Sequence, residues 1–77
     1  MSTTMLDVTL HIDEDTTHNE RENLRDAFFN MKGVMTADCR DERPHLMIVG
    51  FDPEDITTSE LIETVQKQGY HAELVAM

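Results

Sequence analysis

The 77-residue sequence predicts an α+β domain in which two helices cover one face of a four-stranded antiparallel sheet. The first observation is hydrophobic periodicity, which changes along the chain in the order strand, helix, strand, strand, helix, strand. The second is a pair of Thr-x-x-Glu capping boxes, at 17–20 and 57–60, which mark two helix starts. The third is the single cysteine, Cys39, which excludes an intramolecular disulfide and leaves packing to hold the fold.

The first two elements are a strand and a helix. Residues 6–12 alternate apolar and polar side chains, as a strand with one buried face does. The capping box of Thr17 and Glu20 then starts a helix whose apolar residues recur at helical spacing. We expect this helix to end near Lys32, with Gly33 as a left-handed C-terminal cap.

Two strands follow. Val34, Ala37 and Cys39 indicate the first of them, and because their spacing breaks strict alternation we expect either a bulge or an entry residue there. Cys39 falls on the inward face with Ala37, where a free cysteine serves as a small apolar core residue. After a charged turn at residues 40–44, the nearly continuous apolar run 45–51 is typical of a central strand.

The second helix carries the clearest boundary signals. Its capping box spans residues 57–60, and Ile56 and Leu61 flank the cap at the spacing of a hydrophobic staple. Gly69 is placed to end the helix. Residues 70–75 then alternate again and predict the fourth strand.

Right-handed crossovers place both predicted helices on one sheet face, which is the ferredoxin-like βαββαβ arrangement. We assign it to one domain, residues 1–77, with a core from about 5 to 76, and the initiating Met1 favours a free protein. The other sheet face stays open, and Leu46 and Ile48 should project onto it. Exposed apolar side chains on a sheet predict an interaction patch that a homodimer or another protein would cover.

The charge and size of the chain exclude several classes of function. Sixteen acidic residues against six basic ones give a net charge of -10, which argues against nucleic acid and anionic membrane surfaces. No apolar run approaches the roughly 18 residues of a membrane span, and no signal-peptide pattern is present, so we expect a cytoplasmic protein. A chain this short has no room for a deep cleft, and its four histidines lack a nucleophilic partner, so we expect no enzyme.

Four short motifs occur in order along the chain: Gly33-Val34 after the first helix, Phe51-Asp52-Pro53 after the third strand, Leu61 in the second helix, and Gly69-Tyr70-His71-Ala72 before the last strand. Together they resemble the heavy-metal-associated domain of soluble copper chaperones and of P-type metal ATPases. The resemblance covers about residues 6–75. It implies the ferredoxin-like fold and a role related to metal transport.

The departure from this family lies at its metal loop. The family carries Gly-Met-x-Cys-x-x-Cys there, and two thiolates suit a soft cation such as Cu(I). Counting back from Gly33, the corresponding positions are 14–20, where Thr17 and Glu20 replace the two cysteines. The metal site is therefore degenerate, and the replacing pair is itself a capping box.

The leading hypothesis is a non-catalytic module that acts by contact with another protein. In the resembled family the metal loop and the helices also face partner domains, so the acidic stretch 13–22 would meet a basic patch on a transporter or another domain. The expected interaction surface comprises Asp13, Glu14, Asp15, Glu20, Leu46, Ile48 and Tyr70.

Two alternatives remain open. In the first, His18, Glu20 and His71 bind a borderline divalent metal ion such as Zn(II), Ni(II) or Cu(II); otherwise we expect no cofactor. If the same loop has only a structural role, it is an acidic, solvated helix cap. In the second alternative the chain is a small-molecule regulatory module, since ACT-type domains share its order of strands and helices.

Overall fold

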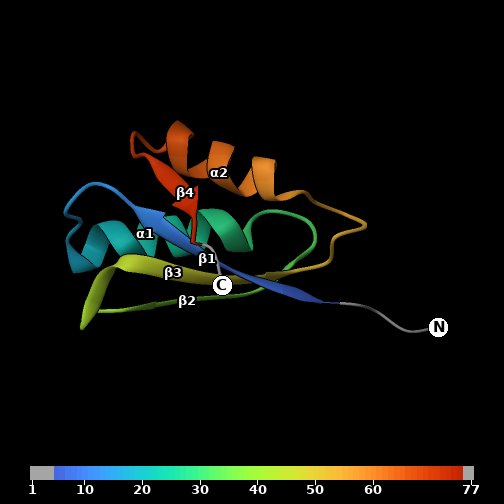
Figure 1. Cartoon of the computed structure of the whole chain (residues 1–77), viewed down its shortest axis with the longest axis horizontal. Coiled ribbons are helices and arrows are strands. Elements are labelled where there is room, and N and C mark those ends of the chain that lie inside the picture. The colour runs from blue at the N-terminus through green and yellow to red at the C-terminus, as the bar shows by residue number, and fades with distance from the viewer. Residues whose placement is uncertain (1–4, 76–77) are drawn as a thin grey trace.

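The chain folds into six elements in the predicted order (Figure 1). The four strands form one antiparallel sheet in the order β2-β3-β1-β4, which confirms the ferredoxin-like α+β fold. This computed structural model describes residues 5–75, so residues 1–4, 76 and 77 of the predicted domain lie outside it. The elements are β1 (Leu6–Ile12), α1 (His18–Phe29), β2 (Val34–Arg40), β3 (Arg43–Phe51), α2 (Thr58–Lys67) and β4 (Ala72–Leu74).

The core lies between the helices and one face of the sheet. Alternate residues of β1 and β3 and the inward stripes of both helices join in one buried cluster, so both helices cover the same face. Burying each large apolar side chain stabilises the fold by about 1.5–3 kcal/mol. Within residues 5–75, neither helix is long and apolar enough to cross a membrane. The largest fully buried side chains are Phe28, Phe51, Leu10, Ile12, Leu24, Met47, Leu61, Val49 and Val65.

Both predicted capping boxes are confirmed. The backbone N–H of Glu20 donates to Thr17 Oγ1 at 3.2 Å, and the N–H of Thr17 donates to Glu20 Oε1 at 2.8 Å. The box at 57–60 repeats this arrangement at the start of α2. Ile56 and Leu61, the predicted staple, are both buried in the core. Local sequence therefore fixes both helix starts.

The end of α2 is also as predicted. Gly69 has a φ of 96°, and its N–H donates to Gln66 O at 2.9 Å. The N–H of Tyr70 donates to Val65 O at 3.2 Å, which completes a Schellman cap. Because Tyr70 belongs to this cap, β4 begins only at Ala72 and is shorter than the predicted strand over 70–75.

The end predicted for α1 is wrong by three residues. The helix stops at Phe29 with Asn30 as its C-cap, rather than near Lys32. Gly33 does have a left-handed φ of 98°, but it lies in the turn into β2. A Cβ atom there would come within 2.7 Å of Asp55 Cβ, so the glycine is required by a close approach of two connections rather than by the helix.

The hairpin of β2 and β3 differs from the prediction at its turn. Arg40 pairs with Arg43, so the strands continue to a tight two-residue turn rather than ending at a loop over 40–44. The register shifts between Val34 and Thr36, where the sequence breaks strict alternation. This shift lies in β2, which is an edge strand of the sheet formed by the described residues.

Candidate functional site

Three connections and the start of α1 meet at one end of the molecule (Figure 1). They are the β1–α1 loop at residues 13–17, the β2–β3 turn at 41–42 and the α2–β4 turn at 68–71. The backbone N–H of Asp13 donates to His71 O at 2.9 Å, which ties the first connection to the third. We call this region the acidic end and define it by the carboxylates of Asp13, Glu14, Asp15, Glu20, Glu22 and Asp41.

Glu20 uses both of its carboxylate oxygens. Oε1 accepts from the N–H of Thr17 in the capping box, and Oε2 accepts from the Tyr70 hydroxyl at 2.8 Å. The hydrogen bond from the Thr17 backbone, followed by that from Tyr70, lowers the pKa of Glu20. The same contact raises the pKa of Tyr70. The turn before β4 therefore lies close to the start of α1.

Glu14 holds His71 in the same way. Oε2 accepts from His71 Nδ1 at 2.6 Å, and Oε1 accepts from the backbone N–H of His71 at 2.8 Å. These bonds lower the pKa of Glu14 and raise the pKa of His71. Charge-assisted hydrogen bonds of this kind are stronger than neutral ones, so the loop and the turn are clamped together.

His18 faces two other carboxylates. Its Nδ1 donates to Asp41 Oδ1 at 3.0 Å, and its Nε2 lies 3.1 Å from Glu22 Oε2. The hydrogen bond to Asp41, aided by both negative charges, raises the pKa of His18. His18 is thereby tied to the β2–β3 turn and not to the turn that carries His71.

Arg21 is a site residue that the sequence analysis missed. Its side chain is 7% exposed and donates to Asp41 Oδ1 at 2.7 Å and to the carbonyl oxygen of Thr16. The signal was present, because Arg21 falls at helical spacing with Leu24 and Phe28 on the buried stripe of α1. With His18, Arg21 lowers the pKa of Asp41.

The structure does not gather the predicted ligands His18, Glu20 and His71. His18 pairs with Asp41, Glu20 with Tyr70, and His71 with Glu14, so the three side chains are not arranged around one metal ion. Among residues 5–75, a different set of potential metal ligands comes together. The ligand atoms of His11, Asp13 and Glu73 all lie within 4.8 Å of one another. Metal binding by the predicted set stays a prediction.

The remaining predicted residues lie on β2 and β3. Cys39 packs against the core from β2, and burial raises the pKa of its thiol, as expected for a core residue. On the open sheet face Ile48 is 44% exposed and Leu46 is half-buried. They line a shallow hollow with charged neighbours, and its lining is Thr9, Asp38, Arg40, Arg43, Leu46 and Ile48.

Several solved structures have this fold. Oxidized MerP from Ralstonia metallidurans CH34 superposes with a TM-score of 0.85 and 20% identity, over 95% of this chain and 100% of that one. The CopZ metallochaperone gives a TM-score of 0.80 and 20% identity, over 88% and 100%. The N-terminal domain of a potential copper-translocating P-type ATPase from Bacillus subtilis, in the Cu(I)-loaded state, gives 0.84 and 21%, over 92% and 88%. No protein-family model and no curated protein matches the sequence.

These superpositions show that the chain has the fold of heavy-metal-associated domains. It has one cysteine, so it lacks the cysteine pair of that family's metal loop. A hydroxyl and a carboxylate at Thr17 and Glu20 do not fit a soft cation, which prefers thiolates. Both groups are moreover occupied by the helix cap. What the domain does must therefore be argued from its own surface.

Proposed function

We propose that this chain is an accessory interaction domain in metal transport, which binds a basic surface of a transporter or another domain through its acidic end. The observation that carries the proposal is the state of the degenerate loop. Where the resembled family places its two thiolates, Thr17 and Glu20 close a helix cap that is locked to Tyr70. The loop is thus built as a fixed surface rather than as an exchangeable soft-metal site.

The acidic end is suited to docking because its charges are both accessible and held in place. The side chain of Asp15 is 98% exposed, and that of Asp13 is 58% exposed. Behind them, Glu14 and Glu20 are fixed by hydrogen bonds that favour their charged forms. Charges held in advance lose little conformational entropy on binding, and a complementary basic surface would be steered toward them.

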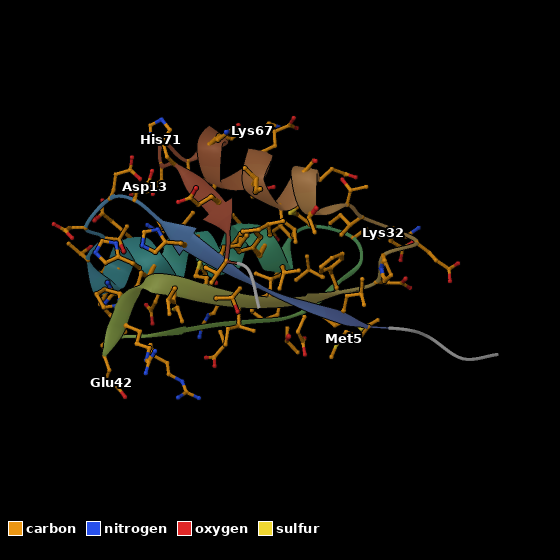
Figure 2. All side chains as sticks on the ribbon, viewed as in Figure 1. Met5, Asp13, Lys32, Glu42, Lys67 and His71 are labelled. Atoms are coloured by element: carbon orange, nitrogen blue, oxygen red, sulfur yellow. The ribbon has the colours of Figure 1, made fainter. Side chains whose placement is uncertain are left out.

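Acidic side chains gather at one end of the molecule, where Arg21 pairs with Asp41 and where Arg40 and Arg43 flank the β2–β3 turn. Figure 2 places Asp13, His71 and Glu42 toward one end of the molecule and Lys32 toward the other. The open sheet face is less suited, because Arg40 and Arg43 interrupt the apolar surface around Ile48. A sheet-to-sheet homodimer would also bring together two chains that each carry a net charge of -10.

The test uses charge reversal and a defined partner. The partner is the N-terminal domain of a metal-transporting P-type ATPase that presents a basic surface, and binding is followed by amide NMR shifts. We expect D15K/E22K to weaken binding strongly at low salt and much less at high salt. The matched control E54K/E63K changes the net charge equally but lies outside the acidic end, and it should bind nearly as the parent does.

Two results would contradict the proposal. One is binding that is independent of salt and equally affected by both double variants. The other is stoichiometric Cu(I) binding in competition with a Cu(I) chelator that C39S abolishes, because this would show soft-metal chemistry through the one thiol.

A further inference from the structure

We infer that the edge formed by β1 and β4 binds one borderline divalent cation, of the Zn(II) class, through His11, Asp13 and Glu73. The ligand atoms of these three side chains all lie within 4.8 Å of one another. The site shares Asp13 with the acidic end and shares no residue with the set predicted by sequence. It does not depend on the partner-binding proposal.

Strand geometry brings the three side chains together. His11 and Asp13 are two residues apart, so their side chains leave the chain on the same side. Glu73 is the direct cross-strand partner of His11, which places it beside His11 on that side. The hydrogen bond from Asp13 N–H to His71 O continues the pairing of β1 and β4 past Ile12. Two of the three donors, His11 and Glu73, therefore lie on paired strands, and Asp13 is held directly beyond the end of β1.

The Nδ1 atom of His11 is the observation that points to a ligand. This atom is shielded from solvent and makes no hydrogen bond, while the His11 side chain as a whole is 42% exposed. The nearest carboxylate oxygen, Asp13 Oδ1, is 3.4 Å away and is not aligned to accept one. Buried polar atoms without a partner are rare in folded proteins. A cation between His11 and its two carboxylate neighbours would take up the lone pair of this nitrogen.

The orientation of the His11 ring is set by its neighbours. The ring stacks on that of His45, with centroids 5.5 Å apart and planes inclined by 13°. His45 is held in turn, because its Nδ1 donates to the carbonyl oxygen of Ile12 at 2.7 Å. This stacking covers one face of the His11 ring and restricts its orientation, which favours a preorganised ligand.

The donor set selects the class of cation. One imidazole nitrogen and two carboxylate oxygens suit Zn(II), Ni(II) or Cu(II), and they do not suit Cu(I). Three protein ligands leave a fourth position of tetrahedral Zn(II) for water. The two carboxylates balance the charge of the ion, and the net charge of -10 draws cations toward the surface.

The experiment is a Zn(II) titration of the full chain, followed by amide NMR and by competition with a chromogenic chelator. We expect one equivalent to bind, with saturable shifts centred on His11, Asp13 and Glu73. H11A and E73Q should each weaken binding by at least about tenfold, since even residues that only support a metal ligand cost that much. H11Q, which keeps side-chain bulk and polarity, should weaken it similarly, and its NMR spectrum checks that the sheet remains folded.

Two controls distinguish binding at this site from binding elsewhere on the chain. E54Q removes one negative charge at a distance from the three ligands and should leave the affinity unchanged. H18A and H71A remove the histidines of the sequence-predicted set and should retain one-to-one binding. The inference is overturned if Zn(II) gives only diffuse, unsaturated shifts, if H11A and E73Q bind as the parent does, or if H18A or H71A abolishes binding.

Discussion

At the scale of single residues, the acidic end is organised by carboxylates that accept hydrogen bonds from one or two neighbouring residues. Glu20 accepts from the Thr17 backbone in the helix cap and from Tyr70, and Glu14 accepts from His71. Asp41 accepts from His18 and from Arg21. Exposed ion pairs contribute little to stability, so these contacts mainly position side chains. The cap is different, because it satisfies backbone donors that have no other partner at a helix start.

Replacement of the cap threonines tests this difference. T17A should lower the free energy of unfolding by about 1 kcal/mol, as loss of an N-cap hydroxyl commonly does. T57A should do the same at α2, because its capping box has the same geometry. T17S should remain close to the parent. Urea unfolding measures all three variants, and an unchanged T17A would show that Thr17 does not act as a structural cap.

The paired histidines predict that stability declines as the pH rises past neutrality. Hydrogen bonds to Asp41 and Glu14 raise the pKa values of His18 and His71 in the folded chain. Such a contribution is fully present below the unfolded histidine pKa of about 6.5, and it is lost as the pH rises through the folded value. We expect the free energy of unfolding in urea to fall gently between about pH 6 and 8.

The carboxylates have the opposite sign. The pKa values of Glu14, Glu20 and Asp41 are lowered, so their contribution is present above about pH 4 and is lost as the pH falls through the folded values. Stability should therefore be greatest between about pH 4.5 and 6.5. The double variant H18A/H71A should flatten the alkaline decline, and an unaltered slope would contradict this assignment.

At the scale of elements, two glycines with nearly equal φ angles have different roles. Gly69 ends α2 with a φ of 96°, and a Cβ atom there would meet nothing within 4 Å. Gly33 has a φ of 98°, but its Cβ atom would come within 2.7 Å of Asp55 Cβ. The first glycine is required by backbone conformation alone, and the second also by packing between two connections.

Alanine at each position should separate these causes. G69A should cost about 1–2 kcal/mol, the usual strain of a left-handed residue. G33A should cost more, because the same strain is joined by a steric clash. G69N should recover part of the loss, since asparagine tolerates this conformation better. Denaturant unfolding gives the order, and a G33A variant more stable than G69A would contradict it.

At the scale of the whole molecule, a net charge of -10 on 77 residues opposes compaction. Salt should screen this repulsion and raise the midpoint of urea unfolding. Screening also weakens the exposed histidine–carboxylate pairs, but these are individually small. The net effect of sodium chloride should thus be stabilising, and a midpoint that falls with salt would show that the local pairs outweigh the repulsion.

Most of the fold could be predicted from the sequence because its signals are local. Capping boxes join residues three apart, and strand alternation repeats every second residue. The prediction failed at element boundaries, namely the end of α1, the β2–β3 turn and the start of β4. Gly33 marks the approach of Asp55 from another connection, and α1 had already ended at Phe29.

The site was predicted less well than the fold. The sequence identified the acidic loop and the absence of a cysteine pair. It did not show that His71 pairs with Glu14, or that Asp41 reaches His18. These partners are 57 and 23 positions apart along the chain, so their contact depends on how the connections converge.

The sequence by itself determined the order of the elements, the N-terminal caps of both helices, the acidic character of the β1–α1 loop and the absence of thiolate ligands in that loop. Only the tertiary structure decided which charges meet. It separated His18 from His71, and it joined His11 to Glu73 across two strands that lie far apart in the chain. The physical reason is that periodicity and capping act over a few residues, whereas pairing of side chains depends on strand register and on where loops converge.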